Sequence, residues 1–124
     1  MIALWLAAAV PSEAAAMYAQ QWARKAVPIA SCTSTEECDV KWAKARAWIA
    51  ENTIFKVVVD EPALFSTPGP IYASTDLSFV MVRSRSQDGH DEIRVRAWCG
   101  NVISCMPKPR TALERLRALI SSTN

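Results

Sequence analysis

Apolar residues recur with a helical period in the segment that follows Ser34. Four of them are spaced by three or four positions: Cys38, Trp42, Ala45 and Ile49. This spacing is typical of an amphipathic helix that buries one face. Ser34 and Glu37 have the S-x-x-E spacing of a capping box, so we expect the helix to begin at Ser34 or Thr35.

The residues after this helix favour strands. Residues 53–59 are rich in β-branched side chains, and a first strand is expected there. The Asp60-Glu61-Pro62 run interrupts the pattern, and residues 63–66 allow strand pairing to resume. Beyond them, Pro68-Gly69-Pro70 predicts a turn or loop. This part of the chain is therefore expected to form a bent or broken strand.

A hairpin is the clearest local pattern. Residues 77–86 and 92–99 favour strands, and the Asp88-Gly89 pair between them has the chemistry of a type I′ turn. With Asp88 and Gly89 as the central turn residues, alternate positions of both strands face the core: Val80, Val82, Ser84, Ile93, Val95, Ala97 and Cys99. A change of one residue in the length of the turn would reverse this assignment.

A second amphipathic helix is expected near the C-terminus. Thr111 and Glu114 repeat the capping-box spacing, and the apolar stripe that follows consists of Leu113, Leu116 and Ile120. The order α-β-β-β-α predicts an α+β fold with two disulfides. Its antiparallel sheet has three strands, or four if residues 63–66 pair, and helices cover one face of it.

The N-terminus has the pattern of a secretory signal. An apolar run from Ile2 to Val10 precedes small residues, and cleavage is expected after Ala16. The run is shorter than the roughly 20 apolar residues that span a bilayer, so no transmembrane segment is expected in the mature chain. No Lys or Arg precedes the run, which leaves an ordinary helix as the alternative. The expected division is a signal peptide at 1–16, a partly helical lead-in at 17–33 and a single α+β domain at 34–122.

Cysteine spacing indicates the compartment. Cys32 and Cys38 are separated by the same interval as Cys99 and Cys105. In an exported chain an even cysteine count implies disulfides, and of the three possible connectivities we favour the two local pairs. The alternatives are a zinc site and a redox-active pair, but both normally have shorter ligand spacings. We therefore expect structural disulfides and no metal.

Two cysteine motifs occur together in this chain. One is C-x5-C-x3-W, from Cys32 to Trp42, and the other is W-C-x-N-x3-C-x-P, from Trp98 to Pro107. In this combination the chain resembles small uncharacterised exported proteins of proteobacteria. The resemblance implies a periplasmic or secreted setting and paired cysteines, and it carries no activity that transfers to this chain.

The hairpin supplies a candidate binding face. In the register above, the surface opposite the core carries four arginines and a tryptophan: Arg83, Arg85, Arg94, Arg96 and Trp98. Arginine binds carboxylates and phosphates bidentately and stacks on planar groups, so this strip fits an anionic or protein partner. The alternative is a solvated outer face whose arginines pair with nearby acids and discourage aggregation.

Catalytic motifs are not apparent. His90 lies at the expected hairpin tip with no nucleophile or second ligand fixed beside it, so we assign no catalytic residue. A chain with three glycines carries no glycine-rich phosphate loop, and no cofactor is expected. The formal net charge of +2 is too small to make nucleic acid the expected partner.

These patterns favour one class of function. The 124 residues suit a single domain, stapled by disulfides and without an assembled catalytic set. We expect a periplasmic or secreted, non-catalytic binding or interaction module of the cell envelope, of which an inhibitor is one form. The alternatives are a small secreted enzyme and an effector or toxin.

Overall fold

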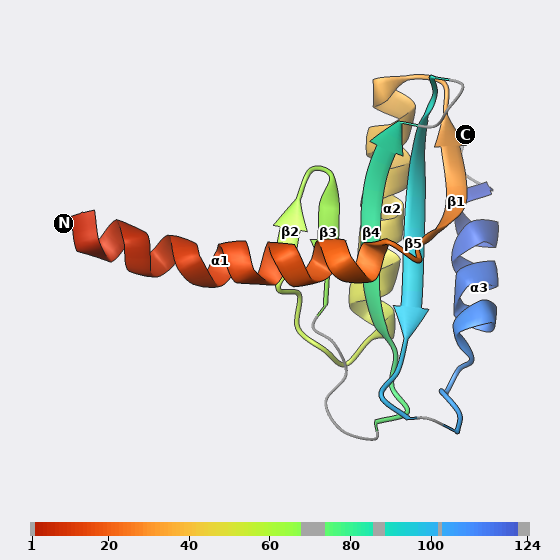
Figure 1. Cartoon of the computed structure of the whole chain (residues 1–124). Helices are drawn as coiled ribbons and strands as arrows, with labels where there is room; N and C mark the ends of the chain where they lie inside the picture. The colour runs from red at the N-terminus through yellow and green to blue at the C-terminus, as the bar shows by residue number, and fades with distance from the viewer. Residues whose placement is uncertain (1, 68–73, 86–88, 102, 122–124) are drawn as a thin grey trace.

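The computed structural model describes residues 2–67, 74–85, 89–101 and 103–121 (Figure 1). The turn expected at Pro68-Gly69-Pro70 and the position of Asp88 lie outside these ranges. The described elements are α1 (Ile2–Ala23), β1 (Val27–Cys32), α2 (Thr35–Asn52), β2 (Val59–Glu61), β3 (Leu64–Ser66), β4 (Ser78–Arg85), β5 (Asp91–Trp98) and α3 (Pro109–Ser121). The mixed class of helices and antiparallel strands is confirmed, whereas the expected strand count was too low.

One five-stranded sheet organises the domain. Its strand order is β1-β5-β4-β3-β2, and every neighbouring pair is antiparallel. Helices α2 and α3 cover one face, while α1 crosses the other (Figure 1). The expectation of helices on one face only was therefore wrong, because the sheet is apolar on both sides. Within the described chain, no helix is both long and apolar enough to cross a membrane.

Helix α2 begins as predicted. The Ser34 hydroxyl accepts a hydrogen bond from the Glu37 N–H at 3.1 Å, and the Glu37 carboxylate accepts one from the Thr33 N–H at 2.5 Å. The backbone hydrogen bond from Thr33 is the main cause of the lowered pKa of Glu37. Farther along, the predicted apolar stripe is buried against the sheet. The local capping pattern thus decided where the helix starts.

Both predicted disulfides are present. Cys32 is bonded to Cys38, and Cys99 is bonded to Cys105. The first bond ties the end of β1 to the first turn of α2, and the second closes the loop after β5. Each loop spans a sequence separation of 6, so each bond restricts only a short stretch of the unfolded chain.

Strand β1 was missed by the sequence analysis. Its residues fall in the expected lead-in segment, yet they pair with β5 from Val27 opposite Val95 to Cys32 opposite Asp91. The pairing is irregular between Pro28 and Ala30. Proline and alanine disfavour strands, so the local composition did not reveal an edge strand that long-range pairing creates.

The strand predicted at residues 53–59 was largely wrong. Only Val59 belongs to a strand, and Ile54 is 72% exposed. The Thr53 hydroxyl holds the start of this segment by donating to the Leu77 carbonyl at 2.7 Å. Pro62 and Ala63 then form the turn between β2 and β3. The β-branched composition favours a strand, but no strand of the described chain pairs with most of the segment.

The register of the β4–β5 hairpin differs by one residue from the prediction. Pairing ends at Arg85 opposite Asp91, so five residues separate the strands instead of two. An odd number of connecting residues reverses the faces of one strand relative to the other. Phe79 and Met81 therefore face the core with Val95, whereas the predicted Val80 and Val82 lie on the opposite face.

Helix α3 starts two residues earlier than its predicted cap. Pro109 is its first residue, where the missing N–H costs nothing, and the Ala112 N–H donates to the Lys108 carbonyl at 3.1 Å. Leu116 and Ile120 are buried as expected, and Leu113 packs beside them.

Replacing Ser34 by Ala tests the cap of α2. We expect the free energy of unfolding to fall by about 1 kcal/mol, because the Glu37 N–H loses its acceptor. Urea denaturation followed by circular dichroism measures it. Thr35→Ala is the matched control, since the Thr35 hydroxyl has no hydrogen bond in the described chain, and its effect should stay below about 0.5 kcal/mol. Equal losses in the two variants would contradict the cap.

Candidate interaction surface

The five residues of the expected binding face lie on two faces of the sheet. Arg83 is opposite Ile93 and Arg85 is opposite Asp91, which places both on the side of α2 and α3. Arg94, Arg96 and Trp98 lie on the side of α1. The single arginine strip was therefore a wrong prediction, caused by the length of the hairpin connection.

Arg83 contacts the first two turns of α2. Its guanidinium donates to the Asp39 carboxylate at 2.7 Å and lies 3.5 Å from the Asp91 carboxylate. Its side chain is only 15% exposed. Arg85, at 73%, is largely exposed and lies 3.5 Å from Asp91. Arg83 thus fixes the hairpin against α2, while Arg85 is open to solvent.

Arg94 serves the junction between α1 and β1. Its Nε and Nη2 atoms donate to the Ala26 carbonyl at 3.2 and 2.9 Å, and its Nη1 atom donates to Glu92 at 2.8 Å. The bidentate contact with a backbone carbonyl holds the chain where α1 gives way to β1. The guanidinium of Arg94 therefore uses its hydrogen bonds within the domain.

Arg96 and two tryptophans form the centre of the α1 side. The rings of Trp22 and Trp98 are stacked, with centroids 4.8 Å apart and planes at 10°. The Arg96 Cζ atom lies 4.7 Å from the Trp22 ring centroid and 5.3 Å from that of Trp98. The guanidinium also donates to the Trp22 carbonyl at 3.2 Å. These contacts attach the last turn of α1 to β5.

Two polar groups in this centre are incompletely satisfied. Burial lowers the pKa of the Arg96 guanidinium, and among the described residues no carboxylate lies within ion-pair distance of it. The indole N–H of Trp98 is buried, and it has no hydrogen-bond partner among the described residues. Arg96 is only partly buried, whereas a buried donor without a partner, such as the Trp98 indole N–H, is uncommon in a folded interior.

An apolar cluster surrounds these groups. Its buried members are Ala19, Val59, Leu64, Val80 and Trp98. Small residues of α1 pack against it, namely Ala15, Ala16 and Ala23. Because alanine lets a helix approach a sheet closely, α1 can lie flat across these strands. We call this side of the sheet, from β2 to β5, the second sheet face.

Helix α1 covers the second sheet face with only part of its length. Figure 1 shows the helix crossing β4, β3 and β2 and then projecting beyond the sheet toward its N-terminus. Its last turn also contacts β5 through the stack of Trp22 on Trp98. The helix has 22 residues, and the cleavage position expected after Ala16 lies within it. The helix that covers this face therefore also contains residues of the expected signal peptide.

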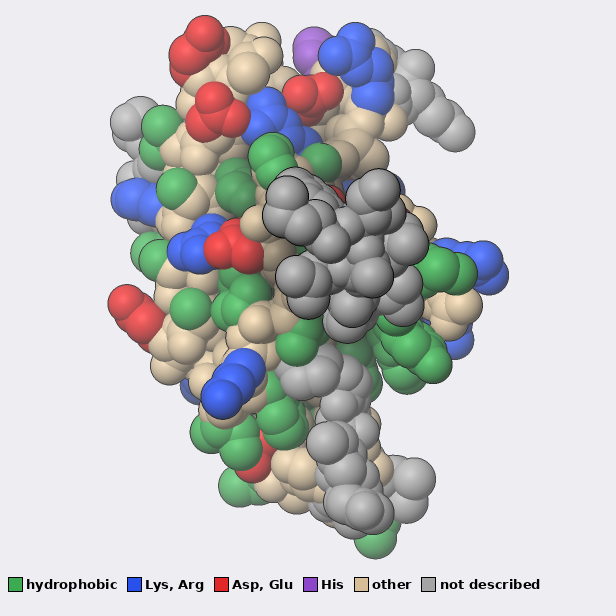
Figure 2. Space-filling model, turned by 90° about the vertical axis from the view of Figure 1, so that its left-hand side faces the viewer, with side chains coloured by type: hydrophobic (Ala, Val, Ile, Leu, Met, Phe, Trp, Pro, Cys, Tyr) green, Lys and Arg blue, Asp and Glu red, His purple; other side chains and the backbone are tan. Residues whose placement is uncertain are grey.

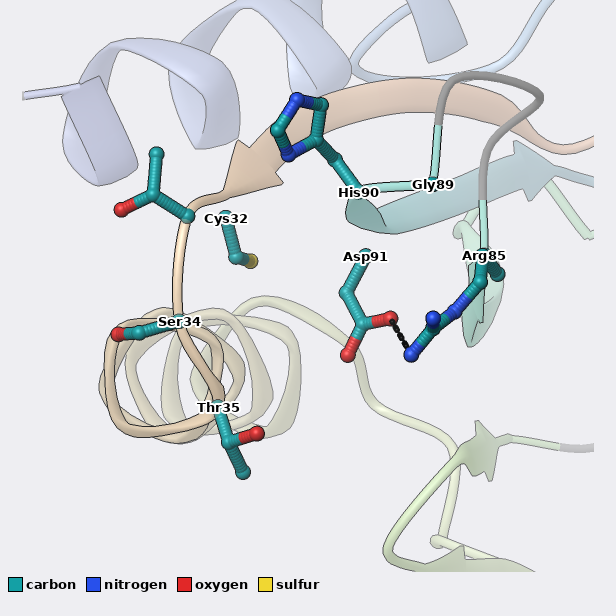
Figure 3. Close-up of a pocket in the computed structure, with 8 residues that line it drawn as sticks. Cys32, Ser34, Thr35, Arg85, Gly89, His90 and Asp91 are labelled. Carbon is teal, nitrogen blue, oxygen red and sulfur yellow. Dashed lines mark ion pairs between the residues drawn. The ribbon is translucent and has the colours of Figure 1, made fainter.

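A small pocket lies at the end of the β4–β5 hairpin where the two strands are connected, away from Trp98. It encloses about 130 Å³ between the end of β1, the start of α2 and the hairpin residues Arg85, His90 and Asp91. Figure 3 shows Asp91 directed toward Arg85, whereas the His90 ring and the Ser34 hydroxyl do not point toward each other. Figure 2 shows the histidine at one end of the molecule, beside both acidic and basic side chains. This pocket is small, polar and open.

The pocket residues have roles in the fold. The Ser34 hydroxyl caps α2, and Cys32 is in a disulfide. The described residues contain no group of three His, Cys, Asp or Glu side chains that could hold a metal. The pocket therefore brings together no nucleophile and base, and no ligand set, among these residues.

Comparisons with known proteins add no family. The sequence matches no family model, and neither a curated protein nor a solved structure matches it. The assignment of the surface therefore rests on its own geometry.

Sequence reasoning missed the partner of Trp98. Trp22 was placed in a lead-in segment without a packing role, and strand β1 beside it was not predicted. A signal was present in the sequence, because Ala15, Ala19 and Ala23 recur every four residues and Trp22 lies next to the last of them. Such a stripe of small residues is typical of a helix that packs closely.

Replacing Trp22 by Ala tests the attachment of α1. We expect the free energy of unfolding to fall by about 1–2 kcal/mol through loss of the ring stack and the cation–π contact. The combined emission of the remaining tryptophans should also shift to longer wavelength, because the Trp98 ring then meets water. Tyr18→Ala, at a 65% exposed aromatic of the same helix, should change stability by less than about 0.5 kcal/mol. A Trp22 variant as stable as the Tyr18 variant would refute this attachment.

Proposed function

We propose that this protein is an exported, disulfide-stapled binding module that uses the second sheet face to hold a protein partner of the cell envelope. The observation that carries the proposal is the apolar cluster on that face, which α1 covers. Antiparallel sheets commonly leave one face polar and solvated. A face built from Val59, Leu64, Val80 and Trp98 instead requires an apolar cover.

The chemistry of the partner follows from the helix that now occupies the face. Helix α1 contacts it through alanines and one tryptophan, so the surface accepts a helix with small residues along one side. Arg96 lacks an acidic partner among the described residues, which favours a partner helix that carries a carboxylate near it. The partner is thus an apolar helical segment with small side chains and one acid.

Export would expose part of the surface. The paired cysteines are consistent with an oxidising compartment, and the N-terminal pattern favours cleavage after Ala16. Cleavage there would remove Ala15 and Ala16 from the cover and keep Ala19 and Trp22. The β2 and β3 end of the second sheet face would then be free to receive the partner.

Intact-mass measurement tests the export step. The chain recovered from an oxidising compartment should be lighter by the mass of residues 1–16, and its four thiols should react with an alkylating agent only after reduction. An unprocessed chain with free thiols would remove the basis of the exported setting.

Photocross-linking tests the surface. A photoreactive amino acid at Val82, which packs on the second sheet face, should give one specific adduct in the producing cell. The same group at Ala43, exposed on α2, is the matched control and should give none. Arg96→Gln, which removes the charge and keeps much of the side chain, should weaken the Val82 adduct several-fold. Adducts from Ala43 alone, equal adducts from both positions, or none from Val82 would refute the proposal.

A further inference from the structure

One end of the sheet exposes aliphatic side chains on separate connections. This end, where β4 begins and β5 finishes, comprises residues 51–56, 74–77, 99–101 and 103–110, and we call it the loop end. Ile54 is 72% exposed there, Ile103 is 89% exposed and Met106 is 69% exposed. Figure 2 shows hydrophobic side chains at the lower end of the molecule, whereas charged side chains gather at the upper end. An exposed apolar patch of this kind marks an interaction site.

Two hydrogen bonds hold these connections at the same end of the sheet. The Thr53 hydroxyl donates to the Leu77 carbonyl at 2.7 Å, which places Ile54 beside the start of β4. The Met106 N–H donates to the Thr75 carbonyl at 2.9 Å, which places Met106 beside the chain that leads into the same strand. Figure 1 shows both connections at the lower end of the sheet, and α1 crosses the sheet above them. The aliphatic side chains can therefore meet one surface together.

The loop that carries Ile103 is constrained. The Asn101 side-chain oxygen accepts hydrogen bonds from the Ile103 N–H at 2.8 Å and from the Ser104 N–H at 2.9 Å. The disulfide between Cys99 and Cys105 closes the same loop. Because the backbone is already fixed while the Ile103 side chain lies in water, burying that side chain against another surface costs little conformational entropy.

Basic side chains accompany the aliphatic ones. Lys56, Lys108 and Arg110 are exposed, and none of them has an ion pair within the described chain. They outnumber the carboxylates of the loop end, which belong to Glu51 and Asp76. Aliphatic side chains with unpaired cations beside them match the acyl chains and the anionic headgroups of a membrane.

The residue types favour a membrane over a protein partner at this end. Protein interfaces depend mainly on aromatic residues and arginine that fill pockets near the centre of the contact. The loop end instead presents isoleucine and methionine on separate connections. Such side chains enter a fluid acyl layer without a matching pocket, because the hydrophobic effect is not directional.

We propose that the loop end binds an anionic phospholipid surface, with Ile54, Ile103 and Met106 entering the acyl boundary and Lys108 and Arg110 contacting headgroups. The sheet then stands end-on to the membrane. The second sheet face, crossed by α1 above the loop end, stays clear of the lipid (Figure 1). The inference therefore adds a second contact surface and does not depend on the protein partner.

Photocross-linking to vesicles tests the lipid contact. The full chain carries a photoreactive amino acid at Ile103 and is irradiated with vesicles of phosphatidylglycerol and phosphatidylethanolamine. Mass spectrometry should detect a phospholipid adduct at that position. The same group at Val40, 51% exposed on α2, is the matched control and should give none. Because the readout belongs to one position, attachment of vesicles to the apolar start of α1 does not imitate it.

Substitutions elsewhere at the loop end separate insertion from chance contact. Ile54→Asp should lower the Ile103 adduct about tenfold, because a carboxylate replaces an inserted aliphatic side chain. Met106→Asp, on the other connection, should have the same effect. Lys108→Gln combined with Arg110→Gln should lower the adduct several-fold, as should vesicles of phosphatidylcholine alone.

Three results would overturn the inference. They are equal lipid adducts at Val40 and Ile103, an Ile103 adduct that neither aspartate variant reduces, and a protein adduct without a lipid adduct when producing cells are irradiated. The adducts from Val82 report on the proposed function separately, so either proposal can fail while the other stands.

Discussion

The antiparallel register between β4 and β5 is the constraint on which the rest of this structure depends. Pairing of Arg85 with Asp91 places Phe79, Met81 and Val95 against α2 and α3. The same pairing places Val80 and Trp98 on the other side, where they need a second cover. A sheet with apolar residues on both faces buries more surface, but it requires three helices to exclude water.

Helix α1 meets this requirement at the second sheet face in an unusual way. Its alanines allow close contact with the strands, and Trp22 anchors its last turn through the stack with Trp98 and the contact with Arg96. The rest of the helix projects away from the domain (Figure 1). In the proposed function, export therefore changes what covers this face, and it links the processing of the chain to the availability of its binding surface.

The two ends of the sheet are protected differently. At the β1 edge, regular pairing is interrupted between Pro28 and Ala30, and the disulfide from Cys32 to Cys38 joins the strand to α2. At the β2 edge the strand is short, but the preceding segment leaves Val57 and Val58 exposed. Edge strands are commonly protected by irregular pairing or by short length, and the two edges of this sheet use different ones of these devices.

Sequence alone determined the features that depend on neighbouring residues. The cap at Ser34, the buried stripe of α2, the local cysteine pairs and the α and β composition all follow from side chains a few positions apart. Tertiary structure decided the rest. One connection of odd length divided the expected arginine strip between two faces, because side chains alternate along a strand. Strand β1 and the attachment of Trp22 arose because partners distant in the chain supplied hydrogen bonds and an aromatic contact. Residues 53–57 kept their strand-favouring composition but found no strand to pair with, since pairing needs a neighbour that local sequence does not specify.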